Sequence, residues 1–140
     1  MTLKAAIIGN GNVAYHLNQA FSSSGIKVVS IHVRDLAKAR DFSGELLTVQ
    51  TEINPDTVDF IFLAVRDDAI QDVLASFSLP HDAIIIHMAG SISIDIFEKI
   101  KDIQCGVCYP LQTLSKQKKV DYKELPLYLE ANSGITYNKL

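Results

Sequence analysis

The sequence lacks the features that mark membrane-spanning, secreted or nucleic-acid-binding proteins. Its longest apolar runs, FIFLAV and AIII, are far too short to cross a bilayer. The first residues, MTLKAAIIGNG, enter an apolar run without the pattern of a secretory signal. The formal net charge is −3, and the one basic cluster, Lys116 to Lys119, contains no aromatic residue. We therefore predict a cytoplasmic protein with no membrane or nucleic-acid partner, in which the basic cluster is a solvated loop.

Cysteine is also scarce. The two cysteines, Cys105 and Cys108, have the CxxC spacing of redox pairs and of half a zinc site. Their setting, IQCGVCYP, has the pattern of a strand, in which residues three apart point to opposite faces. There is no second CxxC and no histidine pair to complete four zinc ligands. The sequence therefore predicts two reduced thiols in or near the core, and no metal site.

The regular alternation of apolar runs and helical patterns indicates the fold class. With 140 residues, 48% hydrophobic and 21% charged, the chain has the size of one domain that needs no metal or disulfide. Alternating segments of this kind are typical of βαβ units, and we predict an α/β fold with a doubly wound, mostly parallel sheet. Strands are expected at residues 4–9, 26–33, 46–49, 58–65, 83–87, 103–109 and 125–131, and helices at 12–24, 34–42, 66–77 and 93–100. Residues 1–131 would form the domain, and residues 132–140 an irregular tail.

The segment IIGNGNVA, residues 7–14, places a glycine-rich turn between the first strand and the first helix. Such a turn lets the backbone approach a pyrophosphate, and the helix N-terminus supplies unpaired N–H groups and a positive dipole end. Gly9 would make the turn, Gly11 would leave room for the phosphates, and Ala14 would let the helix pack on the strand. A plain chain reversal is the alternative, but the flanking strand and amphipathic helix favour dinucleotide binding. The expected donors are the backbone N–H groups of Asn12 and Val13.

The end of the second strand, HVRD, bears on which dinucleotide is bound. An acidic residue there would accept hydrogen bonds from the ribose of NAD, and a basic one would meet the 2′-phosphate of NADP. Arg34 stands at this position and can present a fork of donors to a phosphate, with His32 near enough to assist. Asp35 leaves two alternatives open, because it could contact the ribose or cap the next helix. The sequence favours NADP over NAD.

These segments together resemble the uncharacterised Rossmann-like oxidoreductase family related to pyrroline-5-carboxylate reductases and deazaflavin-dependent NADP reductases. The resemblance runs from IIGNGNVAYHL to LPLYLEA and is carried by the glycine turn, the VRD strand end, FLAVRDDAI and YPLQT. It implies the Rossmann cofactor domain of an NADP-dependent oxidoreductase that acts on a small carbonyl or imine compound. Relatives continue into a helical second domain with dimer contacts. That domain would begin at residues 132–140, and a homodimer is the implied assembly.

The resemblance also implies particular site residues. The implied NADP(H) contacts are Gly9, Asn10, Gly11, Asn12, Val13, Arg34, Ala64, Val65 and Arg66. The substrate crevice beyond the strand ends would be lined by Gly90, Ser91, Tyr109 and Gln112. The chain departs from the family at Met88 and Ala89, where hydroxyl residues are usual, and at Tyr109, where a histidine is common.

Few residues could handle the proton that accompanies hydride transfer, a reaction whose chemistry belongs to the cofactor. His87, at the end of the fifth strand, titrates near neutrality and is the first choice, with a histidine bonded to nearby backbone as the alternative. Thr113 could bond a substrate oxygen or the nicotinamide carboxamide. Asp67 and Asp68 are expected to cap the following helix and to complement its dipole. His16 is expected at the surface. A nucleotide-binding or redox-sensing module without turnover, or a truncated product, is the second hypothesis.

Overall fold

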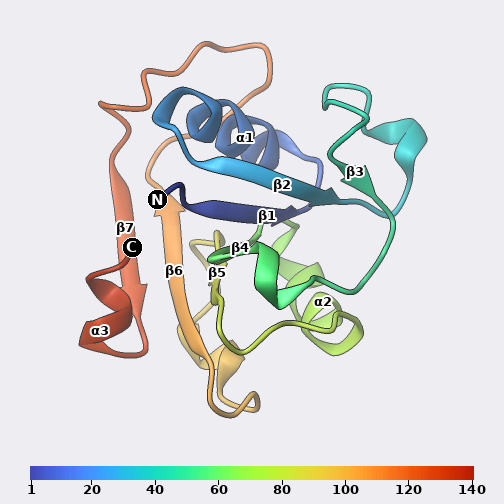
Figure 1. Cartoon of the computed structure of the whole chain (residues 1–140). Helices are drawn as coiled ribbons and strands as arrows, with labels where there is room; N and C mark the ends of the chain where they lie inside the picture. Colours follow the sequence, from blue (N-terminus) through green and yellow to red (C-terminus); the bar gives the residue numbers. More distant parts are fainter.

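A sheet of seven strands forms the centre of the molecule, with helices on both of its faces (Figure 1). The computed structural model describes residues 1–140. The strands are β1 (Lys4–Ile8), β2 (Lys27–His32), β3 (Leu47–Thr48), β4 (Phe60–Leu63), β5 (Ile84–His87), β6 (Gln104–Pro110) and β7 (Leu127–Ala131). Their spatial order is β3-β2-β1-β4-β5-β6-β7, and all neighbours are parallel except β6 and β7. The predicted doubly wound, mostly parallel α/β sheet is confirmed.

The strand order reverses between β1 and β4. From β1 the chain moves outward through β2 to β3, crosses back to β4 on the other side of β1, and continues outward to β7. The carboxyl ends of four strands lie level, because Ile8 pairs with His32 and Leu63, and Leu63 pairs with His87. In open α/β sheets, ligands bind outside the carboxyl ends at such a reversal. This edge is therefore where a site is expected.

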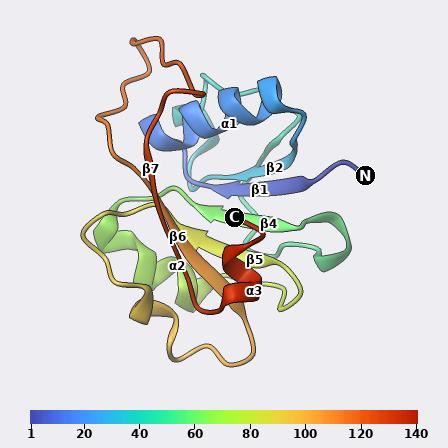
Figure 2. The same cartoon turned by 90° about the vertical axis from the view of Figure 1, so that its left-hand side faces the viewer.

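Helices on the two faces enclose the sheet (Figures 1 and 2). α1 (Asn12–Ser24) has the predicted bounds and ends at Gly25, whose φ of 82° is left-handed, as expected for a glycine C-cap. α2 (Ile70–Ser76) and the 3₁₀ turn η4 (Ile94–Phe97) lie on the opposite face. The remaining short elements are η1 (Leu36–Lys38), η2 (Pro55–Thr57), η3 (Asp67–Ala69) and α3 (Gly134–Tyr137).

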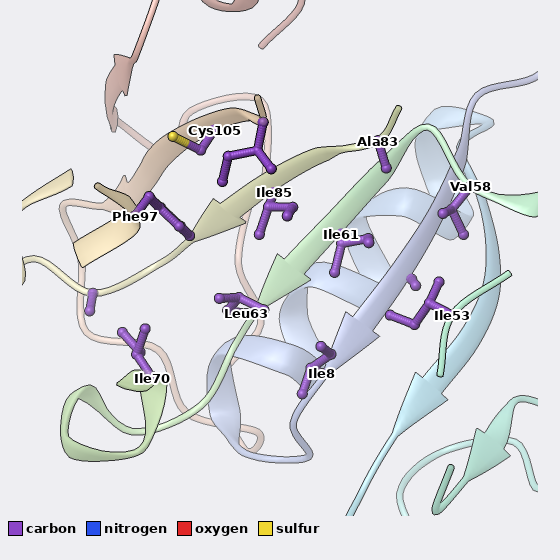
Figure 3. Packing of buried hydrophobic residues seen from close by; sticks show 13 residues of the cluster. Ile8, Ile53, Val58, Ile61, Leu63, Ile70, Ala83, Ile85, Phe97 and Cys105 are labelled. Atoms are coloured by element: carbon purple, nitrogen blue, oxygen red, sulfur yellow. The ribbon is translucent and has the colours of Figure 1, made fainter. Parts of the chain in front are cut away.

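Alternate residues of the central strands divide the core into two layers. Ile61 and Leu63 of β4 are buried in the α2-side layer with Ile70 of α2 (Figure 3). Phe62, between them in sequence, points to the other face, where its ring centroid lies 5.1 Å from that of Phe21 in α1. A parallel strand covered on both faces needs apolar side chains at successive positions. The continuous apolar run FIFL therefore fits the centre of this sheet.

The predicted helix over residues 34–42 is wrong. Only η1 forms there, begun by the Asp35 carboxylate, which accepts a backbone N–H at 3.0 Å. Ala39 and Phe42 are buried in the α1-side layer. Tertiary packing has overridden a weak helical pattern, because a helix this short has little stability of its own.

The helix predicted over residues 66–77 begins later than expected. The α-helix α2 starts only at Ile70 and is preceded by η3, and neither Asp67 nor Asp68 makes a capping side-chain hydrogen bond. The helix predicted over residues 93–100 is reduced to η4, which Ser93 caps. The expected capping by the two aspartates is therefore wrong, although both stand in the first turn of η3, where acidic side chains complement the helix dipole as expected. Their carboxylates make contacts elsewhere, as described below.

The chain after β6 contains an irregular segment and a short helix. Residues 111–126 form no helix or strand and pass beside α1 in both views (Figures 1 and 2, orange). Residues 132–140, predicted to be irregular, contain α3, and Thr136 in it is fully buried. The side chain of Leu140 packs beside Gly106 of β6. No helix of the structure is long and apolar enough to cross a membrane.

The two cysteines lie on opposite faces of β6, as the strand pattern predicts. Both are free thiols. Cys105 belongs to the α2-side layer, and Cys108 packs against the layer under α1. Burial raises the pKa of each thiol to about 11. The prediction of reduced thiols in or near the core is confirmed, and both stay protonated at neutral pH.

Candidate functional site

A groove of about 430 Å³ lies along the carboxyl ends of the strands, where the strand order reverses. It is lined by the β1–α1 turn, the end of β2 and the segment after β4. Seven of the predicted cofactor contacts line it, namely Gly9, Asn10, Gly11, Arg34, Ala64, Val65 and Arg66. The other two, Asn12 and Val13, are the first residues of α1. The fold thus brings three segments that are distant in sequence into one groove.

Gly9 is required by the fold itself. Its φ of 125° lies in the region that side chains rarely adopt. Its N–H donates to the His32 carbonyl oxygen at 2.9 Å, which continues the β1–β2 pairing into the turn. A Cβ on Gly9 would overlap the carbonyl oxygen of Ala64, the residue that follows β4. Both the backbone conformation and the approach of β4 therefore exclude any other residue.

Gly11, by contrast, faces open space. No atom lies within 4 Å of the position that its Cβ would take. The first turn of α1 has no capping side chain and no acidic residue. The backbone N–H groups of Gly11, Asn12 and Val13 have no acceptor within the chain. Free N–H groups at the positive end of a helix dipole form an anion site, so a phosphate fits here.

Arg34 and Asp35, adjacent at the end of β2, have different surroundings. Arg34 is exposed, has no hydrogen-bond or ion-pair partner, and lines the groove. Asp35 caps η1 through its carboxylate and lies 4.0 Å from the ammonium of Lys38. Of the two roles open to Asp35, the structure shows the cap. The guanidinium of Arg34 is left free to bind an anion in the groove.

His32 is not free to assist Arg34. It is 4% exposed, its Nδ1 donates to the Gln50 carbonyl oxygen at 2.7 Å, and its Nε2 accepts from the Ser30 hydroxyl at 2.9 Å. Burial lowers the pKa of His32, and the hydrogen bond to Gln50 opposes this only in part. Both ring nitrogens are used inside the fold, which makes His32 a structural residue of the groove wall.

The segment after β4 connects the groove to a second hollow. Arg66 is largely exposed and pairs with Asp68, with 2.9 Å between Nη2 and Oδ2. The neighbouring Asp67 accepts a hydrogen bond from the hydroxyl of Ser91, which follows β5. The loops after β4 and β5 are thereby tied together at the edge of the sheet.

The second hollow, of about 390 Å³, is lined by three of the four predicted crevice residues, Gly90, Ser91 and Tyr109. The ring of Tyr109 lies close against Gly90, because a Cβ on Gly90 would come within 2.5 Å of Cε1 of that ring. Gln112 and Thr113 are exposed on the segment after β6 and line neither hollow. The structure therefore gathers part of the predicted crevice and leaves these two residues outside it.

His87 is fully buried behind this hollow. Its Nδ1 accepts the Ala89 N–H at 3.2 Å, its Nε2 has no partner, and its ring stacks on Phe97 with 5.8 Å between centroids. Burial lowers the pKa of His87, while nearby backbone groups and the charges of Asp67 and Glu130 oppose the shift. This is the alternative of a strand-end histidine bonded to backbone, and the ring does not line either hollow.

Two residues expected to be solvated are instead held against α1 and the glycine turn. Lys116 donates to the carbonyl oxygen of Asn10 at 3.1 Å, and the side chain of His16 is 3% exposed. The prediction of a solvated loop is wrong at Lys116, and the prediction of a surface position is wrong at His16. Lys116 lies in an irregular segment that gives no periodic signal, and His16, although on α1, is covered by residues of that same segment, so neither contact was recognisable in the sequence.

Comparison with known proteins decides the family. The model of the family described as NADP oxidoreductase, coenzyme F420-dependent, matches residues 4–90, which is more than half of the chain. The chain belongs to this family. The predicted oxidoreductase resemblance and NADP as the cofactor are thereby confirmed, at the level of the NADP-binding domain.

Solved structures of other proteins share this fold. A Bacteroides fragilis protein assigned as an NADP oxidoreductase is 29% identical, with a TM-score of 0.81 over 98% of this chain and 54% of that one. A 1-pyrroline-5-carboxylate reductase from Streptococcus pyogenes is 18% identical, with a TM-score of 0.76 over 99% and 53%. An imine reductase variant from Myxococcus stipitatus in complex with NAD⁺ is also 18% identical, with a TM-score of 0.74 over 99% and 50%. The chain spans about half the length of these proteins. Among the curated proteins compared, none matches.

Proposed function

We propose that the chain is the NADP(H)-binding part of an oxidoreductase that reduces a small carbonyl or imine compound. The observation that carries the proposal is the convergence of the glycine turn, Arg34 and the segment Ala64 to Arg66 in one groove at the reversal of strand order. Two proteins of similar structure support the substrate class, since one is a 1-pyrroline-5-carboxylate reductase and the other an imine reductase.

The residues of the groove fit NADP(H). Gly11 and the first turn of α1 would hold the pyrophosphate with their free N–H groups, and Arg34 would hold the 2′-phosphate. Ala64, Val65 and Arg66 would border the cofactor toward the second hollow. NADPH supplies a hydride when bound. The chain's own task is to orient the nicotinamide against a substrate in the hollow lined by Gly90, Ser91 and Tyr109.

Titration with NADPH and NADH tests this proposal, with Arg34→Ala and Asp35→Asn as matched variants. We expect NADPH to bind more tightly than NADH, and Arg34→Ala to reduce NADPH affinity about tenfold to a hundredfold, since charge-assisted phosphate contacts are among the strongest hydrogen bonds. NADH affinity should stay unchanged. Asp35→Asn keeps a good cap and should leave both affinities unchanged. Equal binding of the two nucleotides by the wild type would refute the assignment of Arg34.

A second function, nucleotide binding without turnover, is favoured by one observation. The predicted proton handlers are not in place, because His87 is fully buried and Thr113 lines neither hollow. NADPH oxidation by the chain alone, measured with a cyclic imine, a ketone and coenzyme F420 as acceptors, separates the two functions. Turnover with any acceptor supports the reductase. Tight NADPH binding with no turnover supports a module whose catalytic groups come from elsewhere.

For the assembly we propose a homodimer in the cytoplasm. The edge strand β7 exposes Leu127 and Tyr128, each about half accessible, and unpaired edges with apolar side chains favour association. Two free thiols fit a reducing compartment. Sedimentation at several concentrations and cell fractionation test these two proposals. A monomer at all concentrations would refute the first.

A further inference from the structure

The segment of residues 111–126, here called the strap, is the only connection between β6 and β7 and has no regular structure. It passes beside α1 and reaches the end of the sheet that carries the glycine turn (Figures 1 and 2). An irregular segment of this length needs side-chain contacts to hold one conformation. Two anchors, Lys116 and His16, supply them.

Lys116 anchors the strap to the groove. Its ammonium donates to the Asn10 carbonyl oxygen at 3.1 Å and to the Asp41 carboxylate at 2.8 Å, and it lies 5.7 Å from the ring centroid of Phe42. The side chain is 22% exposed, against 79% for Lys38 and 83% for Arg66 in the other ion pairs. Partial burial reduces screening, so this pair is stronger than the two surface pairs.

His16 fixes the backbone next to Lys116. Its Nε2 donates to the Ser115 carbonyl oxygen at 2.6 Å, and its Nδ1 accepts from the Tyr122 hydroxyl at 2.8 Å. His16 lies on α1, so the strap is bound to the same helix whose N-terminus faces the groove. The hydrogen bonds of His16 therefore hold Lys116 near the glycine turn independently of the ion pair that Lys116 makes with Asp41.

The contact with Asn10 sets the direction of a neighbouring donor. In a trans peptide the C=O and the following N–H point in opposite directions, and the chain has no cis peptide. Holding the Asn10 carbonyl toward the strap therefore aims the Gly11 N–H away from the strap. The other side of Asn10 is held as well, because its side-chain amide donates to the Lys38 carbonyl oxygen at 3.1 Å. The peptide between Asn10 and Gly11 is thus fixed before any ligand binds.

We propose that Lys116 is a positioning residue for the dinucleotide, which orients the Asn10–Gly11 peptide so that the glycine turn receives a pyrophosphate. The strap is then part of the cofactor site, although it lies more than a hundred residues from the turn in sequence. The inference rests on the proposed NADP(H) binding. It differs from that function in naming a residue which touches the turn and not the nucleotide.

Nucleotide titration of the whole chain tests the proposal with Lys116→Met, Lys116→Arg and, as a matched control on the strap, Lys118→Met. Methionine keeps the length of the side chain and removes the charge. We expect Lys116→Met to weaken NADPH binding about tenfold, which corresponds to one charged hydrogen bond. Lys116→Arg can keep both contacts and should bind within about threefold of wild type. The exposed Lys118→Met should change nothing.

A second probe separates positioning from a general effect on the fold. Adenosine 2′-monophosphate has no pyrophosphate and reports on Arg34 alone, so Lys116→Met should bind it like the wild type and keep the wild-type unfolding midpoint within a few degrees. Loss of both ligands together with a lowered midpoint, or NADPH binding by Lys116→Met equal to wild type, overturns the role of Lys116. Absence of NADPH binding in the wild type overturns the proposed function instead.

Discussion

Two hollows lie at the carboxyl edge of the sheet, the groove at the glycine turn and the crevice after β5, and they are formed by different chemical groups. The groove at the glycine turn is made of backbone: a left-handed Gly9, free N–H groups at the start of α1, and a carbonyl held by Lys116. The crevice after β5 is made of side chains, with the Tyr109 ring on Gly90 and the Ser91 hydroxyl on Asp67. We expect substitutions in the hollow formed by backbone atoms to be costly, whereas the side chains that form the other hollow can rearrange around a substitution. The predictions below test this difference.

The largest effect is expected at Gly9. Gly9→Ala forces a side chain onto a φ of 125° and into the carbonyl oxygen of Ala64. We expect it to cost about 3 kcal/mol or more of unfolding free energy, since backbone strain and a backbone clash act together. Urea unfolding of the variant measures this cost. A loss below about 1 kcal/mol would show that the turn rearranges easily and would remove the contrast between the two hollows.

Gly11→Ala is the matched control in the same turn. Gly11 has a φ of −83°, and nothing lies within 4 Å of its Cβ position. The change in unfolding free energy should stay below about 1 kcal/mol. NADPH affinity should nevertheless fall at least about tenfold, because the new methyl group would occupy the space proposed for the phosphates. Unchanged affinity would place the pyrophosphate elsewhere.

The next effect concerns His87, which supports the crevice from behind. Burial lowers the pKa of His87 and of His32, so both side chains bind protons less readily in the folded chain than in the unfolded chain. Stability contributed by the two neutral rings is therefore complete above the unfolded pKa of about 6.5 and is lost as pH falls below it, with a slope of at most about 1.4 kcal/mol per pH unit for each group. Urea unfolding between pH 8 and pH 5 should show this loss.

His87→Asn separates this titration from packing. Asparagine can still accept the Ala89 N–H but does not titrate, so the loss of stability between pH 8 and pH 5 should become shallower, with the part from His32 retained. At pH 8 we expect a cost of about 1–3 kcal/mol, because the stacking on Phe97 is lost. An unchanged pH slope would mean that the pKa of His87 is the same in the folded and the unfolded chain.

A smaller effect is expected at Gly90. Gly90→Ala places a methyl group 2.5 Å from the outer atoms of the Tyr109 ring, which is 36% exposed and can swing aside. We expect a cost of about 1 kcal/mol, and less in the double variant with Tyr109→Ala, since residues in contact are coupled. NADPH affinity should not change. Strictly additive costs would show that the ring does not rest on Gly90 in solution.

The smallest effect is expected at the bond between Ser91 and Asp67. It is solvent-exposed, so Ser91→Ala should lower the unfolding free energy by less than about 0.5 kcal/mol. Ser91→Thr, which keeps the hydroxyl, is the control. If the bond aligns the two hollows, turnover with a small imine should fall in Ser91→Ala and be retained in Ser91→Thr. Equal turnover of all three proteins would show that this hydrogen bond is a surface contact that does not affect turnover.

The sequence predicted the sheet and the turn because both leave periodic or conformational signals. Apolar runs predict strands covered on both faces, and the spacing of Gly9 and Gly11 predicts a turn before a helix. Short helices were predicted less well. The segment after β2 has a helical pattern but forms only η1, and Phe42 at its end is buried in the core. Packing of this kind depends on residues far away in the chain, which local patterns do not contain.

The candidate site divides in the same way. The groove residues could be assigned because backbone donors follow from glycines and from the start of a helix. The strap contacts could not, because Lys116 and His16 acquire their partners only when residues 99 and 106 positions apart meet. His87 was placed correctly at a strand end, yet its burial depends on Phe97 and on the loop after β5, which the strand pattern does not describe.

The placement of the two thiols on opposite faces of β6 gives the protein a pair of native reporters. Burial keeps both thiols protonated and slows alkylation, but only Cys105, which is 3% exposed, needs its side of the sheet to open before it reacts, because Cys108 is partly exposed. The labelling rate of Cys105 therefore measures opening beneath α2 and η4, and that of Cys108 measures how well the layer beneath α1 shields its thiol. The glycine turn leads into α1, so slower labelling of Cys108 alone on addition of NADPH would show that the nucleotide stabilises the layer beneath α1.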